Sequence, residues 1–255
     1  MMVRTAVLAS GGGSNLKAIL SHLGQTGNLP SAAHRPVTGG KAAAQVVLVV
    51  SDRNEAGALE HARRAGVETA VVPVTGRDQD AVARDTLETL AAAGTELVLL
   101  AGYLRRVPAA VVRNYRGRML NIHPALLPAF GGKGMYGMHV HRAVMEAGCR
   151  VTGVTIHFVD EEYDRGPILI QWPVPVLLHD TAESLAERVL KVEHLLYPAA
   201  VEALCGWIAA GVDPEELASG SPDVKRGYLS EPASFDLGDL DEPSGSSIRR
   251  ALGLD

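Results

Sequence analysis

The feature that most constrains the fold is a regular alternation of short apolar runs with longer segments of helical periodicity. The first apolar run, residues 3–9, is continuous, which is typical of a strand buried on both faces of a sheet. Repeated alternation of strand and helix predicts a parallel sheet covered by helices on both faces. We therefore expect an α/β fold with a Rossmann-like, three-layer, mostly parallel sheet. The expected strands are residues 3–9, 46–50, 69–72, 97–101 and 119–122, and the expected helices are 15–23, 54–65, 77–93 and 107–115.

The second half of the chain has a different character. Residues 151–159 and 168–176 are strand-like, and Pro173 and Pro175 indicate an edge strand, because proline cannot donate to a sheet ladder. A long helix is then expected to open at Asp180, which has capping-box spacing to Glu183. Its apolar face repeats at helical spacing through Leu185, Val189, Val192, Leu196 and Ala200.

Two segments lack any such periodicity. Residues 24–41 and 212–255 are rich in small and turn-forming residues. We expect an exposed loop in the first and a flexible or disordered extension in the second. The functional domain is therefore predicted to be residues 1–211, with 212–255 as a C-terminal extension.

Charge and hydropathy exclude several classes of protein. The 24 lysine and arginine residues are outnumbered by 29 aspartate and glutamate residues, so the basic excess of a nucleic-acid-binding protein is missing. Residues 1–10 lead directly into glycines and predict a strand instead of a signal peptide, and no apolar run approaches the ~20 residues of a membrane-spanning helix. Cys149 and Cys205 match no disulfide framework or zinc spacing. We expect a cytoplasmic protein with small-molecule partners, and neither nucleic acid nor membrane.

A glycine-rich turn, Ser10-Gly11-Gly12-Gly13-Ser14-Asn15, joins the first strand to the first helix. Glycines let the main chain approach an anion, and the helix N-terminus offers free N–H groups, so the turn can hold a phosphate. Ser14 or Asn15 can cap the helix or donate to that phosphate. An ordinary tight turn is the structural alternative, with about equal weight.

Asn121 and His123 close the strand at 119–122 and point to the same side of it, because strand side chains alternate. An amide donor beside an imidazole suits acyl transfer, in which negative charge develops on a carbonyl oxygen. A structural asparagine and a hydrogen-bonded histidine at a strand end are the alternative.

The loop at residues 160–167 is dense in acidic side chains. A carboxylate from it can orient His123 and raise the pKa of that imidazole, although a solvated hairpin is the simpler explanation of a lone charge run. The residues alone do not select one carboxylate from Asp160, Glu161, Glu162 and Asp164.

A metal site receives little support. His123, His139, His141 and His157 match no zinc-binding spacing, so we expect no metal. His157 alternates with apolar neighbours, which predicts a strand residue that is either structural or lines the site.

Taken together, these segments resemble the glycinamide ribonucleotide formyltransferases, folate-dependent enzymes of de novo purine synthesis. The resemblance covers about residues 3–211 and follows the family order of motifs. The motifs are Leu8-Ala9-Ser10-Gly11-Gly12-Gly13-Ser14-Asn15-Leu16, Leu100-Ala101-Gly102-Tyr103-Leu104-Arg105, Leu120-Asn121-Ile122-His123-Pro124, His157-Phe158-Val159 with Asp164-Arg165-Gly166-Pro167, and Glu193-His194-x-x-Tyr197-Pro198.

The resemblance implies a catalytic triad of Asn121, His123 and Asp164, and so selects one carboxylate from the acidic loop. It implies that Asp164 keeps His123 charged and that 10-formyltetrahydrofolate is the formyl donor. It also implies a monomer or a homodimer. Residues implied to bind the ribonucleotide are Gly13, Ser14, Asn15, Lys191 and Glu193. Residues implied to bind the folate are Arg77, Leu104, Arg105, Arg106, Val107, Asn121, Asp160, Glu161, Glu162, Tyr163 and Asp164.

The chain departs from the family pattern in four places. The loop at 24–41 and the loop at 131–138 are longer than expected, residues after 211 are extra, and Arg165 replaces a common glycine. These departures affect the substrate loops and leave the chemistry intact.

Other classes remain as alternatives. A formyltransferase acting on methionyl-tRNA or on a sugar nucleotide shares the triad, but the tRNA enzymes carry a basic C-terminal domain, unlike the acidic residues 212–255. Formyl-folate hydrolases carry an N-terminal regulatory domain, whereas here the expected domain begins at Val3. A dinucleotide-dependent oxidoreductase would need a third glycine where Leu16 stands, and Asp52 is only a weak candidate for its ribose-binding acid. A ligand-binding module without catalysis is the last alternative.

Overall fold

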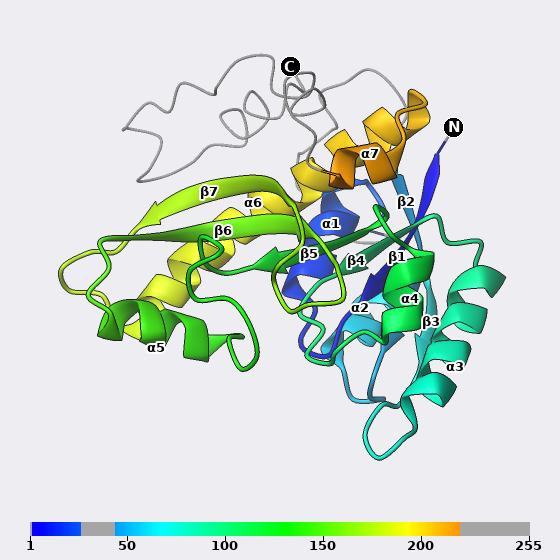
Figure 1. Ribbon diagram of the computed structural model, residues 1–255, viewed down its shortest axis with the longest axis horizontal. Helices are drawn as coiled ribbons and strands as arrows, with labels where there is room; N and C mark the ends of the chain where they lie inside the picture. The colour runs from blue at the N-terminus through cyan, green and yellow to red at the C-terminus, as the bar shows by residue number, and fades with distance from the viewer. Residues whose placement is uncertain (1, 27–43, 220–255) are drawn as a thin grey trace.

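The computed structural model describes residues 2–26 and 44–219, and the structural statements below concern these residues. A seven-stranded sheet in the order β3-β2-β1-β4-β5-β6-β7 forms its centre (Figure 1). The strands are β1 (Val3–Leu8), β2 (Ala44–Ser51), β3 (Glu68–Val71), β4 (Leu97–Leu100), β5 (Met119–His123), β6 (Val151–Phe158) and β7 (Ile168–Pro175).

The first five strands are parallel, as the alternation with helices predicts. Strands β6 and β7 join the sheet antiparallel to their neighbours. The connection between them is short, and short connections can join only antiparallel strands. Pro173 and Pro175 lie in β7, the outer strand, which confirms the prediction of an edge.

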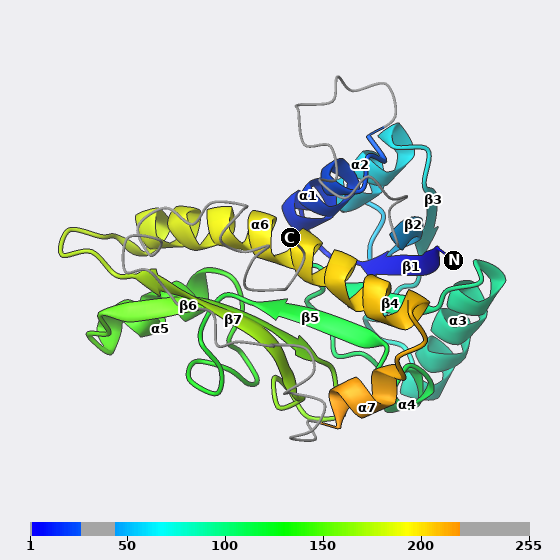
Figure 2. The same cartoon turned by 90° about the horizontal axis from the view of Figure 1, so that it is seen from above.

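Helices cover both faces of the sheet and complete the three layers. Figure 2 shows α6 running along one face beside α1 and α2, with α3 and α4 on the other side. The helices are α1 (Ser14–His22), α2 (Gly57–Arg64), α3 (Gln79–Ala92), α4 (Ala109–Asn114), α5 (Met138–Glu146), α6 (Ala182–Ala209) and α7 (Pro214–Ala218).

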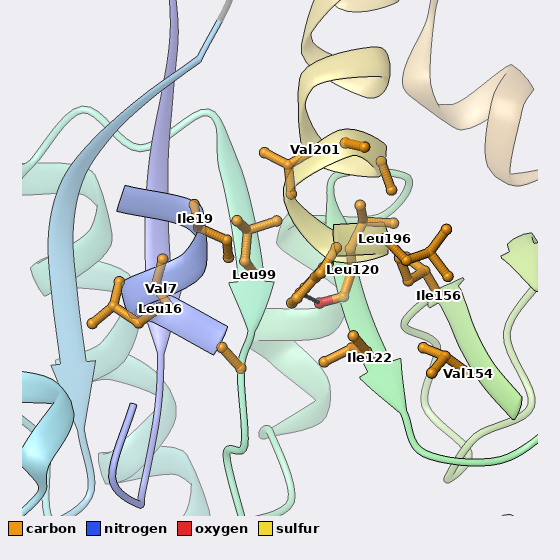
Figure 3. Packing of buried hydrophobic residues seen from close by; sticks show 14 of the residues in the cluster. Val7, Leu16, Ile19, Leu99, Leu120, Ile122, Val154, Ile156, Leu196 and Val201 are labelled. Carbon is orange, nitrogen blue, oxygen red and sulfur yellow. Dashed lines mark hydrogen bonds between the residues drawn. The ribbon is translucent and has the colours of Figure 1, made fainter. Parts of the chain in front are cut away.

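Alternation along the strands divides the core into two apolar clusters. Val7 belongs to one cluster with Leu16 of α1 and Leu196 of α6 (Figure 3), whereas its neighbour Leu8 belongs with Val82 of α3 to the cluster on the opposite face. A strand buried on both faces therefore has no polar side, which explains the continuous apolar runs of the sequence.

Two local predictions need correction. Helix α6 is capped by Thr181 and Ser184, which form the reciprocal capping box, while Asp180 binds Arg188 and the Leu177 amide instead. Thr181 takes the cap because its hydroxyl reaches the Ser184 N–H, so the box lies one residue later than predicted. Helix α5 was not expected.

The two irregular segments fall mostly outside the described residues. Residues 27–41 of the predicted loop and 220–255 of the predicted extension are among those not described. The extension nevertheless begins with an ordered helix, α7, whose Leu217 is buried. Gly117 lies directly against the Pro214–Glu215 backbone, so the start of the extension packs on the domain.

Candidate active site

Strands β1, β4 and β5 run parallel and end at the same edge of the sheet. The glycine-rich turn follows β1, residues 101–107 follow β4, and His123 is the last residue of β5. Ligands bind at this carboxyl edge in open α/β sheets, particularly where the strand order changes direction. The change occurs between β1 and β4, so the fold places three of the predicted segments around one point.

Asn121 and His123 lie on one side of β5, as the period of the strand predicts. The Asn121 Nδ2 atom lies 3.1 Å from His157 Nε2 across the β5–β6 pair. His123 is buried and its Nε2 donates to the Phe130 carbonyl at 2.8 Å. Its other nitrogen, Nδ1, is therefore the one that faces Asp164.

Asp164 lies between the two imidazoles. Its Oδ2 is 3.8 Å from His123 Nδ1 and its Oδ1 is 3.6 Å from His157 Nε2. The Gly132 amide donates to Oδ2 at 2.8 Å, and the backbone of Asp164 adopts a left-handed φ of 55°. A non-glycine residue in this conformation marks a constrained position, so this carboxylate is held by both its backbone and its partners.

Burial and neighbouring charges shift the pKa values of both members of the His123–Asp164 pair. Burial raises the pKa of Asp164, but contacts with His157, Gly132 and the His123 charge outweigh it and leave the pKa below its usual value. Burial lowers the pKa of His123, and the opposing effect of Asp164 does not overcome it. Desolvation of the imidazole therefore outweighs the neighbouring carboxylate in its effect on the pKa of His123, and the charged state expected for this histidine stays a prediction.

His157 is a site residue that the sequence only partly indicated. Its Nδ1 donates to the Phe158 carbonyl at 2.9 Å, so its Nε2 faces Asn121 and Asp164. It thereby links two members of the predicted triad. Its place on a strand was predicted from alternation, but its contact with the acidic loop depends on the β6–β7 connection.

The glycine-rich turn meets the middle of α6. Asn15 Nδ2 donates to Glu193 Oε2 at 2.6 Å, and burial raises the pKa of Glu193 to about 7 while this hydrogen bond lowers it. Gly13 is the N-cap of α1, with a left-handed φ of 79°, and no side chain caps this helix. Of the two roles considered for Ser14 and Asn15, capping of α1 is therefore not seen, because Asn15 donates to Glu193 and Ser14 is exposed.

Lys191 does not join this group. It is exposed and lies two residues before Glu193 on α6, about 200° away around the helix axis. The structure therefore brings Glu193, but not Lys191, to the glycine-rich turn.

The two expected folate segments are linked to each other. Arg106 Nη2 donates to the Glu161 carbonyl at 2.9 Å and lies 5.7 Å from the centre of the Tyr163 ring. Arg113 on α4 binds the Glu161 carboxylate at 3.0 Å. Residues 104–107 and 160–164 are thus brought together by exposed contacts. Within them Leu104 and Glu162 are exposed, Val107 is buried in the core, and Asp160 accepts from the Glu162 amide.

Arg77 is placed elsewhere. It follows β3, the outer strand, and binds the Asp85 carboxylate at 2.6 Å and the Pro73 carbonyl at 3.1 Å. Strands β2 and β1 separate it from β4, so the structure does not bring it into contact with the other expected folate residues.

Asp52 is the residue that sequence reasoning undervalued. Its carboxylate is almost fully buried after β2 and binds Arg105 Nε at 2.7 Å and Arg53 Nη2 at 3.3 Å. A carboxylate occupied in this way does not face a ribose, which counts against the dinucleotide-binding alternative. Its only signal in the sequence is its place at the end of a predicted strand.

Comparison with known proteins agrees with this geometry. The sequence pattern of the formyl transferase family matches residues 3–201. The chain belongs to the formyl transferase family. The match spans the glycine-rich turn, the triad and most of α6, so every core element of the candidate site falls inside it.

Two bacterial members of the formyl transferase family are named for the same activity. Phosphoribosylglycinamide formyltransferase of Bacillus subtilis is 35% identical over 206 residues, covering 80% of this chain and 96% of the relative. The crystal structure of glycinamide ribonucleotide transformylase 1 from Symbiobacterium toebii superposes with a TM-score of 0.69 at 39% identity, covering 80% of this chain and 88% of that one. These likenesses confirm the α/β fold with its mostly parallel sheet.

The plant relatives are longer. The chloroplastic phosphoribosylglycinamide formyltransferase of Arabidopsis thaliana is 45% identical over 204 residues, which are 79% of this chain and 65% of the relative. The chain thus spans slightly less than two thirds of that relative's length, and 61% of the Vigna unguiculata relative.

The described residues of this formyl transferase contain neither a membrane-spanning helix nor a cluster of metal ligands. No helix among them is long and apolar enough to cross a membrane. No group of three or more His, Cys, Asp or Glu side chains in the same residues is arranged to hold a metal ion.

Proposed function

We propose that this chain transfers the formyl group of 10-formyltetrahydrofolate to the amine of glycinamide ribonucleotide. The products are N-formylglycinamide ribonucleotide and tetrahydrofolate, in de novo purine synthesis. The observation that carries the proposal is the Asp164 carboxylate lying between His123 and His157, with Asn121 bound to the second imidazole. The names of the bacterial relatives support the choice of substrates.

The two substrates have separate places in this proposal. The ribonucleotide phosphate binds the main-chain N–H groups at the start of α1, where Gly11 and Gly12 are exposed and a Cβ atom would meet nothing within 4 Å. Gly13 and Ser14 complete that turn, and Glu193, fixed by Asn15, holds the ribonucleotide beyond it. The folate binds main chain of residues 104–107 and 160–164.

The donor brings a formyl carbonyl on N10, and the chain's residues stabilise the charge that develops on it. The amine nitrogen bonds to the formyl carbon, the carbon–N10 bond breaks, and one proton passes from the amine to N10. Asn121 and His123 donate to the carbonyl oxygen, each contributing roughly 3 kcal/mol in a site shielded from water. Asp164 accepts the proton from the amine through a water and returns it toward N10.

The hydrogen bonds of His123 define how it acts. Its Nε2–H is committed to the Phe130 carbonyl, so it can donate to a substrate oxygen only from Nδ1. That requires the imidazolium form, which burial disfavours and Asp164 favours. In the proposed mechanism, the developing oxyanion adds a second negative charge near Nδ1, beside that of Asp164. Together the two charges stabilise the proton on Nδ1 in the transition state.

One assay tests the proposal and separates its rivals. The full chain is mixed with glycinamide ribonucleotide and 10-formyl-5,8-dideazafolate, and release of the deformylated product is followed by absorbance. We expect turnover that depends on both substrates. Product release without the ribonucleotide would indicate a hydrolase, and transfer only to methionyl-tRNA or a sugar nucleotide would replace the proposed acceptor. The assay does not address location or oligomeric state, so the cytoplasmic location and the monomeric or homodimeric state expected from the sequence remain predictions.

A further inference from the structure

A buried polar cluster lies beneath the two predicted substrate segments, at the carboxyl ends of β2, β1 and β4. Its centre is Asp52, whose side chain is 2% exposed. Arg105 donates to it from Nε at 2.7 Å, and Arg53 approaches both carboxylate oxygens at 3.3 and 3.4 Å. A carboxylate buried this completely needs partners on each oxygen, so its contacts restrict where those partners can lie.

Ser10 extends the cluster to both substrate segments. Its hydroxyl donates to Asp52 and accepts from the Leu104 amide at 2.9 Å, while its own amide donates to the Gly102 carbonyl at 3.0 Å. Ser10 is buried and is the first residue of the glycine-rich turn. Asp52 therefore holds Leu104 through Ser10 and Arg105 directly.

The charge of Asp52 is secured by the same contacts. Burial raises the pKa of this carboxyl, but hydrogen bonds from Arg105, Ser10 and Arg53 outweigh it and hold the pKa below its usual value. The group is therefore ionised at neutral pH, and its contacts are charge-assisted hydrogen bonds, which are shorter and stronger than neutral ones.

We infer that Asp52 is a positioning residue that fixes main chain 104–105 of the folate segment against the glycine-rich turn of the ribonucleotide segment. The inference rests on the proposed function for the identity of the two ligands. Asp52 touches neither of them; it acts through Arg105 and Ser10. It thus sets the separation of two substrates that must meet with their reacting atoms aligned, where small displacements are costly.

The test uses Asp52→Asn in the full chain, which keeps the shape and removes the charge. We expect the KM for the formyl donor and the Kd of its 5,8-dideaza analogue to rise roughly tenfold, because a charge-assisted contact that orders the segment is lost. In an Arg105→Gln variant, which already lacks the Arg105–Asp52 hydrogen bond, adding Asp52→Asn should raise the KM and the Kd by much less.

Asp180→Asn is the matched control, because Asp180 also forms a buried pair with an arginine, at 2.7 Å from Arg188, but lies at the start of α6. It should lower Tm comparably and leave both constants unchanged. If Asp52→Asn lowers Tm like the control and leaves KM and Kd within twofold, the inference is overturned. Should Asp52→Asn fail to fold, Arg105→Lys, which lacks the Nε donor, must show the same rise.

The outcomes for the wild-type chain separate the two proposals. If Asp52→Asn weakens binding of the analogue, the positioning role of Asp52 is supported. If the wild-type chain binds the analogue but transfers no formyl group to glycinamide ribonucleotide, only the proposed function is overturned. A wild-type chain that does not bind the analogue overturns both.

Discussion

His123 directs Nδ1 toward Asp164, whose Oδ2 lies 3.8 Å away, and commits Nε2 to the Phe130 carbonyl. The separation is longer than a hydrogen bond, so the two groups interact through charge and not through a shared proton. Burial lowers the pKa of His123 and Asp164 opposes that effect. The imidazolium form therefore depends on one neighbouring carboxylate.

Replacing that carboxylate should affect both charge and turnover. In Asp164→Asn we expect kcat to fall at least about 100-fold, from the loss of an acid–base group. The pKa of His123 should also fall below its wild-type value, because the favourable negative charge is gone. Histidine NMR titration measures the second effect without any substrate. A wild-type pKa in the variant would contradict the electrostatic role, and Asp180→Asn serves as a control for the loss of an unrelated carboxylate.

Glu193→Gln should change the pH dependence of stability. Burial raises the pKa of Glu193 from 4.5 to about 7, so the folded protein keeps a proton that the unfolded chain loses above about pH 4.5. Stability from this group is full below pH 4.5 and declines as pH rises to about 7, with a total loss of roughly 3 kcal/mol.

Glutamine still accepts from Asn15 and cannot ionise, so the variant should be the more stable protein at pH 8. Thermal unfolding from pH 4 to 8 measures the difference, and the exposed Glu60→Gln is the control. Parallel curves for the wild type and Glu193→Gln would show that the buried carboxyl does not titrate in this range.

Arg106→Ala should loosen the link between the two expected folate segments. It removes a hydrogen bond to the Glu161 carbonyl and the contact with the Tyr163 ring. Both are exposed, so we expect only about a fivefold rise in the KM for the formyl donor, with little change in the KM for the ribonucleotide. Steady-state kinetics with Arg64→Ala, an exposed ion-paired arginine on α2, gives the baseline. Equal effects on both KM values would count against a link that is specific to the folate.

Gly117→Ala should destabilise the chain by displacing α7. Gly117 has a left-handed φ of 69°, and a Cβ there would meet the Pro214 and Glu215 backbone at 2.7 Å. Gly66→Ala is matched in backbone strain, with φ 71°, but its Cβ would meet nothing within 4 Å. We expect a loss of about 1 kcal/mol for Gly66→Ala and about 2–4 kcal/mol for Gly117→Ala in denaturant unfolding.

Ending the chain at residue 211 removes α7. In this shortened chain, Gly117→Ala and Gly66→Ala should lower the free energy of unfolding by similar amounts. A difference that persists in the shortened chain would mean that Gly117 is restricted by something other than the helix.

Local residue patterns were enough to predict the order of strands and helices in the parallel half, the edge position of β7, and the shared side of Asn121 and His123. These features depend on periods of 2 and 3.6 residues, which neighbours along the chain define. The resemblance to a family then singled out Asp164, which periodicity could not do. A hydroxyl one residue away was enough to move the predicted cap of α6 from Asp180 to Thr181.

Contacts between side chains far apart in the sequence could not be predicted in this way and depend on how the elements pack. Asn15 and Glu193 are 178 residues apart, and Asp52 and Arg105 are 53 apart, yet the members of each pair are joined by a hydrogen bond. The strand order places Arg77 away from the folate segments. The helical repeat of α6 places Lys191 on a different face of the helix from Glu193. Such pairings follow from the sheet order and from the need of buried polar groups for partners, and neither is encoded in the local pattern of residues.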